Sequence, residues 1–440
     1  MSIMELSLME LQNPWWHDRK AIAEDEKVKK VLASGEKLTI GLGDRNTVMI
    51  GPRQLGKTTA LKYDIYKKIE KEGVDPKSIL YYSFDTARDY GVISDVILSF
   101  LKATSGKRYL YLDEVSFVDE WQRPVKFLLD SPAAKDVRIY VTGSASINLR
   151  KELFPGRNIT VMEFLPGMFA DFVQSFASED LRKFVKSNRS GDIATVIARS
   201  NKAIMHFDEL NRLFRIFMLT GGFPLPVFDH FATGSVTEST FDTHWNAFLS
   251  DISKAERSVE TSTAIIQELI KSYGSKINMS KLARNARIPS HVTAREYMEL
   301  LKELFIVEYI FPISDRGIPL FRKERKAYFT DPFLFNLFSN RLNIPTAGTE
   351  PKVVEGIVHS HLSRMLTGIG YVQKEKETDF VSKGLSIEVK WQENVTKLDI
   401  PKSDSTHNIV LSKTTSEGGI IPVAIFLSLL GENGWQYKMA

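Results

Sequence analysis

The sequence predicts a multidomain α/β protein, and three observations carry that prediction. The chain has 440 residues, of which 43% are hydrophobic, which suffices for roughly two to four domains with separate cores. In the N-terminal third, short apolar runs alternate with helical patterns, as in a parallel sheet whose strands are joined by helices. One of these runs, residues 47–50, leads into the glycine-rich segment GPRQLGKTT.

Composition excludes several classes of protein. The chain has no cysteine, so disulfides and thiolate metal sites are excluded, and the composition suits a reducing compartment. The N-terminus lacks a basic segment before an apolar run, and the longest apolar run, near residues 420–430, is shorter than the ~20 residues that span a bilayer. We therefore expect a cytoplasmic protein without a membrane partner. A net charge of +4 does not by itself indicate nucleic-acid binding.

The glycine-rich segment fits the phosphate-binding pattern G-x-x-x-x-G-K-[ST] at every fixed position. Its backbone N–H groups would wrap phosphates at a helix N-terminus, while Lys57 neutralises charge and the Thr58 hydroxyl binds Mg²⁺. The sequence therefore predicts ATP and Mg²⁺ as cofactors. The predicted contacts are Gly51, Pro52, Arg53, Gln54, Leu55, Gly56, Lys57, Thr58 and Thr59.

A second buried strand, residues 108–112, ends in two acids. Asp113 would hold Mg²⁺ through water, and Glu114 would orient and deprotonate the attacking water. Ser144 ends the next strand, residues 137–144, where it can contact the γ-phosphate or the water. The alternatives are a solvated strand end for the acids and a simple turn for Ser144. Further strands are predicted at residues 78–85 and 159–164.

The middle of the chain becomes helical. From about Met168 to Glu260 few strand-like runs occur, which predicts a helical region. The segment GGFP at residues 221–224 is predicted to be a hinge or tight turn. A loop with no part in an ATPase cycle is the alternative.

A helix-turn-helix is predicted next, from residues 280–286 and 290–304, followed by a strand and a basic stretch that suggest a winged hairpin. Between Lys271 and Lys326 there are twelve basic and six acidic residues, about +6. This is the charge pattern of duplex or branched DNA binding, although winged helices also serve as protein–protein spacers. The residues predicted to contact nucleic acid are His291, Thr293, Arg295, Arg322, Lys323, Arg325 and Lys326.

The C-terminal region combines a helix near residues 353–366 with a hairpin, predicted as residues 371–381 and 385–391. Alternate residues of a strand share a face, so Glu388 and Lys390 project together, and Asp379 can join them from the adjoining strand. These are the working groups of PD-(D/E)XK nucleases, in which Asp379 and Glu388 would hold Mg²⁺ and Lys390 would position the water. Glu355 matches the accessory acid. A DNA-binding or docking module without cleavage is the alternative.

The motifs together resemble a known family, the prokaryotic, archaeal-type AAA ATPases that carry a C-terminal nuclease-like domain. The resemblance rests on GPRQLGKTT, LYLDE (110–114), TGSAS (142–146), FPGR (154–157), GGFP, YFTDP (328–332), ETDF (377–380) and IEVK (387–390). It implies that Arg157 is a candidate arginine finger that reaches a neighbouring subunit, and therefore a homo-oligomer, a hexameric ring. A surface charge without that role is the alternative for Arg157. NPWW, residues 13–16, is also similar to archaeal members. Its tryptophans are expected to pack, and a nucleotide or partner contact is the alternative.

The predicted architecture is an AAA-type P-loop ATPase core with a helical lid, a winged-helix domain and a PD-(D/E)XK nuclease-like α/β domain. The predicted domains are an N-terminal helical segment (1–36), the core (37–167), the lid (168–264), the winged helix-turn-helix (265–340) and the nuclease-like domain (350–440). We expect an ATP-driven DNA-processing protein. The rival is a signalling or scaffold ATPase whose nuclease-like domain binds a partner without cleavage. A small-molecule kinase is disfavoured, because its lid would not need a basic winged helix.

Overall fold

The computed structural model describes residues 3–33, 42–145, 154–314, 316–373 and 377–431. The remaining parts of the predicted N-terminal segment, core and last domain, and Ser146 of the TGSAS motif, lie outside the described residues. The chain forms two compact units: the first holds Met1–Leu165, and the second begins at Pro166 and holds the rest of the described chain except Glu303–Phe305. Within the described residues, no helix is long and apolar enough to cross a bilayer.

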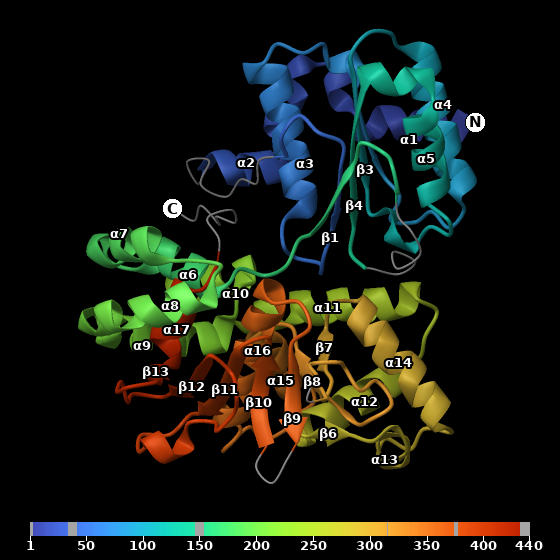
Figure 1. The fold of residues 1–440 in the computed structure, drawn as a ribbon. Coiled ribbons are helices and arrows are strands. Elements are labelled where there is room, and N and C mark those ends of the chain that lie inside the picture. The colour runs from blue at the N-terminus through green and yellow to red at the C-terminus, as the bar shows by residue number, and fades with distance from the viewer. Residues whose placement is uncertain (1–2, 34–41, 146–153, 315, 374–376, 432–440) are drawn as a thin grey trace. The chain divides into compact units, whose positions relative to one another are not determined.

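The first unit contains a five-stranded sheet (Figure 1). Its strands are β1 (Thr47–Ile50), β2 (Ile79–Ser83), β3 (Arg108–Asp113), β4 (Val137–Gly143) and β5 (Thr160–Glu163). They run in the order β2-β3-β4-β1-β5, and every neighbouring pair is parallel. The prediction of a parallel sheet from these five runs is confirmed. The order places β4 between β1 and β3, so the segments after these three strands emerge side by side at the carboxyl edge of the sheet.

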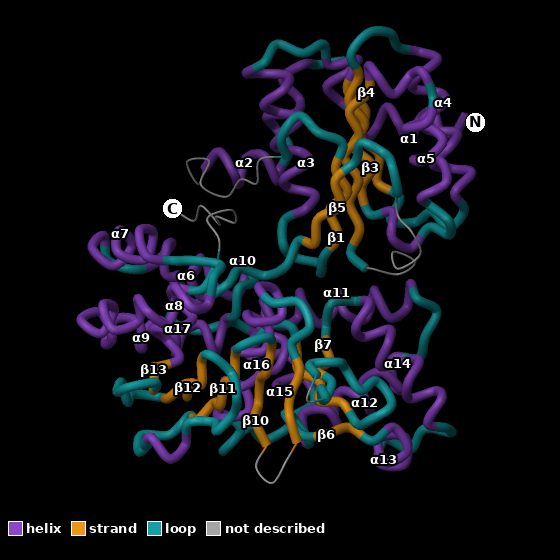
Figure 2. The backbone as a smooth tube through the Cα atoms, viewed as in Figure 1, coloured by secondary structure: helices purple, strands orange, loops and turns teal. Residues whose placement is uncertain are grey.

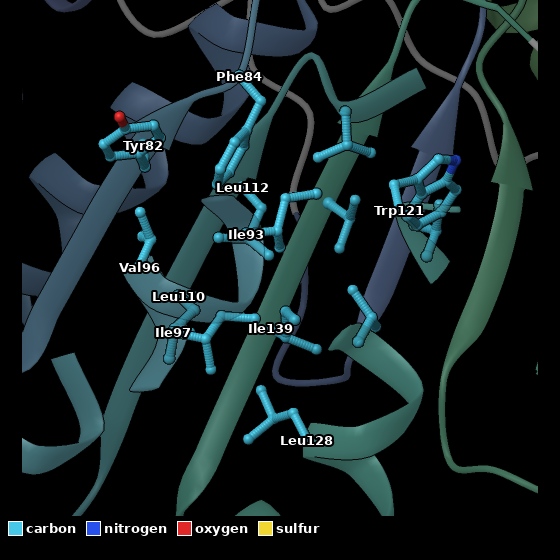
Figure 3. Close-up of a cluster of buried hydrophobic side chains, with 14 of the residues drawn as sticks. Tyr82, Phe84, Ile93, Val96, Ile97, Leu110, Leu112, Trp121, Leu128 and Ile139 are labelled. Atoms are coloured by element: carbon cyan, nitrogen blue, oxygen red, sulfur yellow. The ribbon is translucent and has the colours of Figure 1, made fainter. Parts of the chain in front are cut away.

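Helices cover both faces of this sheet, as parallel strands require. They are α1 (Ile3–Gln12), α2 (Glu26–Ala33), α3 (Lys57–Tyr66), α4 (Tyr90–Ala103) and α5 (Gln122–Asp130). On one face, Ile93, Val96 and Ile97 of α4 pack with Leu110 and Leu112 of β3 (Figure 3). On the other face, α2 and α3 form a second apolar core with the sheet. The sheet is therefore packed between two apolar layers, which hold the carboxyl ends of its strands in place.

The NPWW motif closes the exposed edge of β2. Asn13 accepts the Tyr81 N–H with Oδ1 (2.7 Å) and donates from Nδ2 to the Tyr81 carbonyl (2.8 Å), which imitates a neighbouring strand. Both indoles donate to the Ile79 carbonyl, Trp15 at 3.3 Å and Trp16 at 2.8 Å. Side chains therefore satisfy the backbone groups that an edge strand leaves unpaired. The motif has a packing role in this structure.

The second unit begins with helices, in agreement with the predicted helical region. They are α6 (Phe169–Phe176), α7 (Glu179–Asn188), α8 (Ile193–Ser200), α9 (Phe207–Thr220), α10 (Pro224–Thr233), α11 (Glu238–Lys254) and α12 (Val259–Lys271). The GGFP turn joins α9 to α10. Gly222 donates its N–H to Asp331 Oδ2 (2.8 Å). A Cβ at Gly221 would lie 1.7 Å from Asp331 Oδ1, so only glycine fits this contact.

A helix-turn-helix and a small sheet follow (Figure 2). The helices are α13 (Met279–Asn285) and α14 (His291–Glu303). The strands are β6 (Lys276–Ile277), β7 (Val307–Ile310) and β8 (Arg325–Phe329), and they form an antiparallel sheet in the order β6-β8-β7. The loop between β7 and β8 has the position of a wing.

The last part of the second unit is a mixed five-stranded sheet with helices. The helices are α15 (Pro332–Arg341), α16 (Glu350–Met365) and α17 (Val423–Leu429). The strands are β9 (Gly370–Gln373), β10 (Glu377–Ser382), β11 (Leu385–Lys390), β12 (His407–Ser412) and β13 (Ile420–Pro422), in the order β13-β12-β11-β10-β9. The first three strands are antiparallel, and β12 and β13 run parallel to β11.

One predicted strand of this sheet was wrong. Residues 371–381 form two strands, because Gln373 pairs with Glu377 and the chain reverses between them. The alternation of polar and apolar residues is the same in one long strand and in a hairpin, so the sequence pattern does not separate them. The reversal gives β10 a partner on both edges, which satisfies its backbone groups and buries Phe380.

Candidate functional site

The glycine-rich segment forms a loop between β1 and α3, and the packing explains its glycines. A Cβ at Gly51 would lie 1.8 Å from the Phe164 carbonyl oxygen, which leaves no room for any other residue. Gly56 has a left-handed backbone (φ +87°). Lys57 donates from Nζ to the carbonyls of Gly51 (2.7 Å) and Pro52 (2.8 Å). The lysine therefore folds over the loop, with its ammonium at the centre of the cradle.

The rest of the loop and the first turn of α3 hold the other predicted phosphate contacts, Arg53, Gln54, Leu55, Thr58 and Thr59. Arg53 pairs with Asp85 after β2, with 3.3 Å between Nη2 and Oδ1. Gln54 is exposed and has a positive φ of 64°. Thr58 and Thr59 are half-buried at the helix N-terminus. The loop is thus presented at the carboxyl edge of the sheet, as a phosphate-binding helix start requires.

Asp113 lies beside this loop and is held by hydroxyl groups from both neighbouring strands. It is 2% exposed at the end of β3. The Tyr81 hydroxyl of β2 donates to its Oδ2 (2.7 Å), and the Thr142 hydroxyl of β4 donates to its Oδ1. Burial, and next the Asp113 charge, raise the pKa of Tyr81. Two neutral donors therefore orient Asp113 without neutralising it, which suits a ligand for a hydrated cation.

Glu114 and Ser144 carry buried oxygen atoms near Asp113. Glu114 has a left-handed backbone (φ 57°) and donates its N–H to the Thr142 hydroxyl (3.1 Å). Its Oε2 and the Ser144 Oγ are buried and have no hydrogen-bond partner among the described residues. Buried polar atoms nearly always bond something, so these two oxygens indicate a place for water or phosphate oxygens. The donor set, the glycine cradle and these oxygens fit a nucleotide with Mg²⁺.

Arg157 lies on the loop before β5 and is held within its own unit. It makes a double hydrogen bond to Asp130 of α5, with distances of 2.8 Å from Nε and 2.7 Å from Nη2. This bond lowers the pKa of Asp130. The side chain of Arg157 is 25% exposed.

The helix-turn-helix presents a basic surface. Lys281, Arg284 and Arg287 of α13 and its turn are exposed, as are His291 and Arg295 of α14. Thr293 is half-buried at the start of α14, where its N–H donates to the Ser290 hydroxyl (3.1 Å) as a helix cap. On the wing, Arg322 and Lys323 are exposed.

The expectation that the last two basic residues of the wing are exposed was wrong. Arg325 is half-buried; it pairs with Glu299 (3.3 Å) and lies over the Tyr309 ring, 4.6 Å from its centre. Lys326 is 2% exposed and points into the interior. The basic run crosses from loop into β8, where successive side chains point to opposite faces. The sequence pattern did not locate that crossing.

The predicted residues of the C-terminal region do lie together. We call Glu355 (α16), Glu377 and Asp379 (β10) and Glu388 (β11) the carboxylate cluster. Asp379 Oδ2 accepts the Val389 N–H (2.9 Å), and Glu388 Oε1 pairs with Lys390 Nζ (2.7 Å). Burial, and next Glu355 and Glu388, raise the pKa of Asp379 to about 7.

Lysines accompany each acid of the cluster. Glu355 pairs with Lys326 (2.9 Å) and with Lys352 (2.8 Å). Burial opposes ionisation of Glu355, but Lys326 and Lys352 hold its pKa below the ordinary value. Across the described residues, no group of three or more His, Cys, Asp or Glu side chains is arranged to hold a metal ion.

Sequence reasoning missed several residues of these sites. Tyr81 and Thr142 fix Asp113, and Lys326 and Glu377 belong to the cluster in the second unit. Thr142 could have been found from its place one strand away from the acids. Lys326 had no such signal, because it lies far from the cluster in sequence.

Two family models match the chain. Residues 44–173 match the AAA domain family. Residues 211–344 match a domain of unknown function, DUF8612, which spans the helix-turn-helix and the small sheet. The chain contains an AAA-type P-loop ATPase domain. The AAA domain, as a class, binds ATP with Mg²⁺, and here it coincides with the parallel sheet, the loop and Asp113.

Among curated proteins, one uncharacterized protein of Haemophilus influenzae is 24% identical over 302 residues, 64% of this chain and 66% of that protein. An uncharacterized protein of Methanocaldococcus jannaschii is 29% identical over 170 residues, 36% of each chain. The chain thus spans less than two thirds of the length of either relative. Both relatives are described only as uncharacterized proteins, so their names indicate no activity.

Solved structures show only weak likeness. The Aeropyrum pernix Orc1 protein in complex with DNA has a TM-score of 0.31 and 11% identity, over 73% of this chain and 92% of that one. The Thermotoga maritima RuvB Holliday junction branch migration motor has a TM-score of 0.25 and 14% identity, over 68% and 89%. Scores this low carry no argument about function.

Proposed function

We propose that this protein is an ATP hydrolase whose turnover is coupled to DNA held by its helix-turn-helix. The observation that carries the ATPase part is the meeting of the glycine cradle, Asp113 and two unpartnered buried oxygens at one sheet edge. The exposed basic surface of α13, α14 and the wing supports the DNA part.

In the proposed reaction, the AAA domain holds the nucleotide and orients water. Lys57 and the loop N–H groups would bind the phosphates, and Thr58 and Asp113 would hold Mg²⁺, which would supply positive charge at the phosphates. Glu114 accepts the proton of the attacking water at Oε2, since that oxygen is buried and unpartnered. Ser144 Oγ, the second unpartnered oxygen, donates to the γ-phosphate. The Thr142 hydroxyl accepts the Glu114 N–H and donates to the Asp113 carboxylate, so it fixes the two acids relative to each other.

Arg157 supports a homo-oligomer, proposed as a hexameric ring. The residue is partly exposed and held by Asp130, a surface carboxylate. Exchange of that partner for a neighbouring subunit's phosphate would retain the double hydrogen bond, because phosphate and carboxylate oxygens accept a guanidinium in the same way. Arg157 would then act in trans as an arginine finger.

DNA would meet the basic surface through phosphate contacts that position it without reading sequence. The residues that remain available are Lys281, Arg284, Arg287, His291, Arg295, Arg322 and Lys323. Val292, Ile318 and Phe321 are also exposed here, at 52%, 58% and 69%. Apolar side chains between basic ones suit contact with sugars and bases.

A nuclease-like fold for the last sheet is supported by its order of elements. A helix with Glu355 precedes three antiparallel strands that carry Asp379, Glu388 and Lys390, and parallel strands follow. A second candidate function is a scaffold ATPase whose nuclease-like domain binds a partner without cleavage. The observation that favours it is the pairing of the cluster acids with lysines, which leaves little charge to attract a metal ion.

The experiment is ATP hydrolysis with and without single-stranded, duplex and branched DNA, at low and moderate salt. We expect several-fold stimulation by at least one form, abolished by Lys57→Ala. The double variant Arg284→Ala, Arg295→Ala should lose the stimulation and keep basal turnover. Arg182→Ala, an exposed arginine on α7, is the matched control. Turnover that no DNA form changes would contradict the coupling and favour the scaffold.

A further inference from the structure

A buried lysine from another sheet lies in the middle of the carboxylate cluster. Lys326 Nζ lies 2.7 Å from Glu377 Oε1, 2.9 Å from Glu355 Oε1 and 3.7 Å from Asp379 Oδ1. Its side chain is 2% exposed. One ammonium thus bridges three acids that come from α16 and β10, and two of them, Glu355 and Asp379, were expected to serve a metal-dependent nuclease.

The cluster has as many lysines around it as acids. Glu355, Glu377, Asp379 and Glu388 carry four acid groups, and Lys276, Lys326, Lys352 and Lys390 carry four ammonium groups within ion-pair distance of them. Lys276 pairs with the second oxygen of Glu377 at 2.9 Å. Mg²⁺ sites hold the ion through one or two carboxylates. Here the protein supplies the compensating charge itself.

The fold holds Lys326 in this position through its own strand and through the wing. Tyr328, on the same face of β8, also donates its hydroxyl to Glu355 Oε1. Beyond the strand, the wing is tied to β9: the Ile313 N–H donates to the Tyr371 carbonyl (2.9 Å), and the Tyr371 N–H donates to the Phe311 carbonyl (3.1 Å). The ammonium is therefore anchored by an entire strand and not by one flexible side chain.

A divalent ion does not fit this arrangement. Mg²⁺ needs oxygen ligands at about 2.0–2.1 Å in an octahedron. Instead, Glu355 Oε1 pairs with the Lys326 ammonium at 2.9 Å, and Asp379 Oδ1 lies 3.7 Å from the same ammonium. Asp379 Oδ2 accepts the Val389 N–H, and Glu388 pairs with Lys390. In the part of the chain that the structure describes, no metal-binding group of three acids or histidines is formed. The residues thus disagree with the metal that a nuclease-like fold implies.

We propose that Lys326 is an internal cation that replaces the divalent ion of the carboxylate cluster, so that the protein folded in this way keeps the cluster free of metal. The proposal rests on the nuclease-like part of the proposed function. It adds that the acids are all present and that the Lys326 ammonium is what prevents metal binding. Loss of the Lys326 charge should open the cluster to one divalent cation.

The test is Mn²⁺ binding to the full chain without nucleotide, followed by electron paramagnetic resonance and by calorimetric titration. Lys326→Met removes the charge and nearly keeps the length of the side chain. Lys383→Met makes the same change at an exposed position on the turn between β10 and β11. We expect Lys326→Met to bind one more Mn²⁺ per chain than the wild type and Lys383→Met, and to lose it again when Glu388→Gln is added. Mn²⁺ should raise the melting temperature of Lys326→Met alone.

Two outcomes would overturn the proposal. One is a folded Lys326→Met protein, judged by circular dichroism and by normal ATP turnover, that binds no additional Mn²⁺. The other is a wild-type protein that binds an Mn²⁺ ion which Glu388→Gln removes; this comparison does not depend on whether Lys326→Met folds. DNA cleavage is scored separately. If Lys326→Met binds additional Mn²⁺ but does not cleave DNA, the result supports Lys326 as the internal cation and argues against a nuclease function. If ATP turnover is independent of DNA, the result argues only against the proposed coupling of turnover to DNA.

Discussion

The nucleotide site of the first unit and the carboxylate cluster of the second contain the same kinds of groups, lysines and acids, in opposite arrangements. In the nucleotide site, Lys57 donates to two backbone carbonyls, and two neutral hydroxyls hold the Asp113 carboxylate. In the cluster, Lys326 lies directly between acids. A carboxylate that neutral donors hold keeps its charge for a cation, whereas buried acids that pair with a lysine are already satisfied.

The largest expected effect tests whether the nucleotide site is prepared in this way. Glu114→Gln should lower ATP turnover by about 10²–10⁴-fold, because the general base is lost. Nucleotide binding should persist, since the loop and Lys57 are unchanged. Turnover and the affinity for a fluorescent ATP analogue are measured together. Glu120→Gln, an exposed acid that also has a positive φ, is the control. Wild-type turnover in Glu114→Gln would show that another group accepts the proton.

The next effect contrasts the two lysines through stability. Lys326→Met should lower the free energy of unfolding by about 3–5 kcal/mol, because it leaves buried acids without their cation. Lys57→Met removes hydrogen bonds to two backbone carbonyls and should cost less, about 1–3 kcal/mol. Urea denaturation of both variants gives the comparison. Equal losses of unfolding free energy would mean that Lys326 and Lys57 contribute equally to stability, which would contradict the contrast between the two sites.

A third prediction concerns the sheet edge that supports the nucleotide site. Asn13→Ala removes three hydrogen bonds, two of them to the Tyr81 backbone, and should destabilise the first unit by about 2–3 kcal/mol. Tyr81 also orients Asp113, so ATP turnover should fall as well. Lys102→Ala, at an exposed position on α4, leaves this edge intact and serves as the control. Unchanged unfolding would mean that water replaces the Asn13 bonds.

The smallest expected effect arises on α16, the helix that carries Glu355. His361 is buried, accepts the Phe169 N–H with Nε2 (2.8 Å) and pairs with the Ile357 carbonyl through Nδ1 (2.8 Å). Burial, and next the charge of Arg364, lower its pKa to about 3, against about 6.5 in an unfolded chain. The native state therefore binds fewer protons between these values, and stability present above pH 6.5 is lost as the pH falls.

Between pH 6.5 and 5 the loss from His361 should be about 2 kcal/mol. Chemical denaturation across this range measures it, and His361→Gln should flatten the curve although its stability at pH 7 is lower. His291→Gln, exposed on α14, is the matched comparison. A wild-type curve that is flat from pH 5 to 6.5 would contradict the buried neutral state of His361.

Much of the nucleotide site could be predicted because its residues lie in short continuous segments of the sequence. The loop, the acid pair and Ser144 each follow a strand, and strands of a parallel sheet end at one edge. Glu355, Asp379, Glu388 and Lys390 were likewise predicted from a helix and a hairpin. Lys326 was misplaced on the wing surface, and the predicted strand 371–381 is a hairpin. The first error concerns the face of β8 to which a side chain points, and the second concerns where the chain reverses. Both depend on contacts with residues far away in the sequence.

The sequence by itself determined the P-loop, the parallel sheet and the identity of most acids, because glycine sterics and strand alternation act over a few residues. The tertiary structure decided what those acids meet. Only the packing of β8 against α16 and β10 brings Lys326 to Glu355 and Glu377, across 29 residues in one case. The energy of a buried charge depends on its neighbours in space, so only the folded chain could show which carboxylates are prepared for a ligand and which are satisfied by the protein.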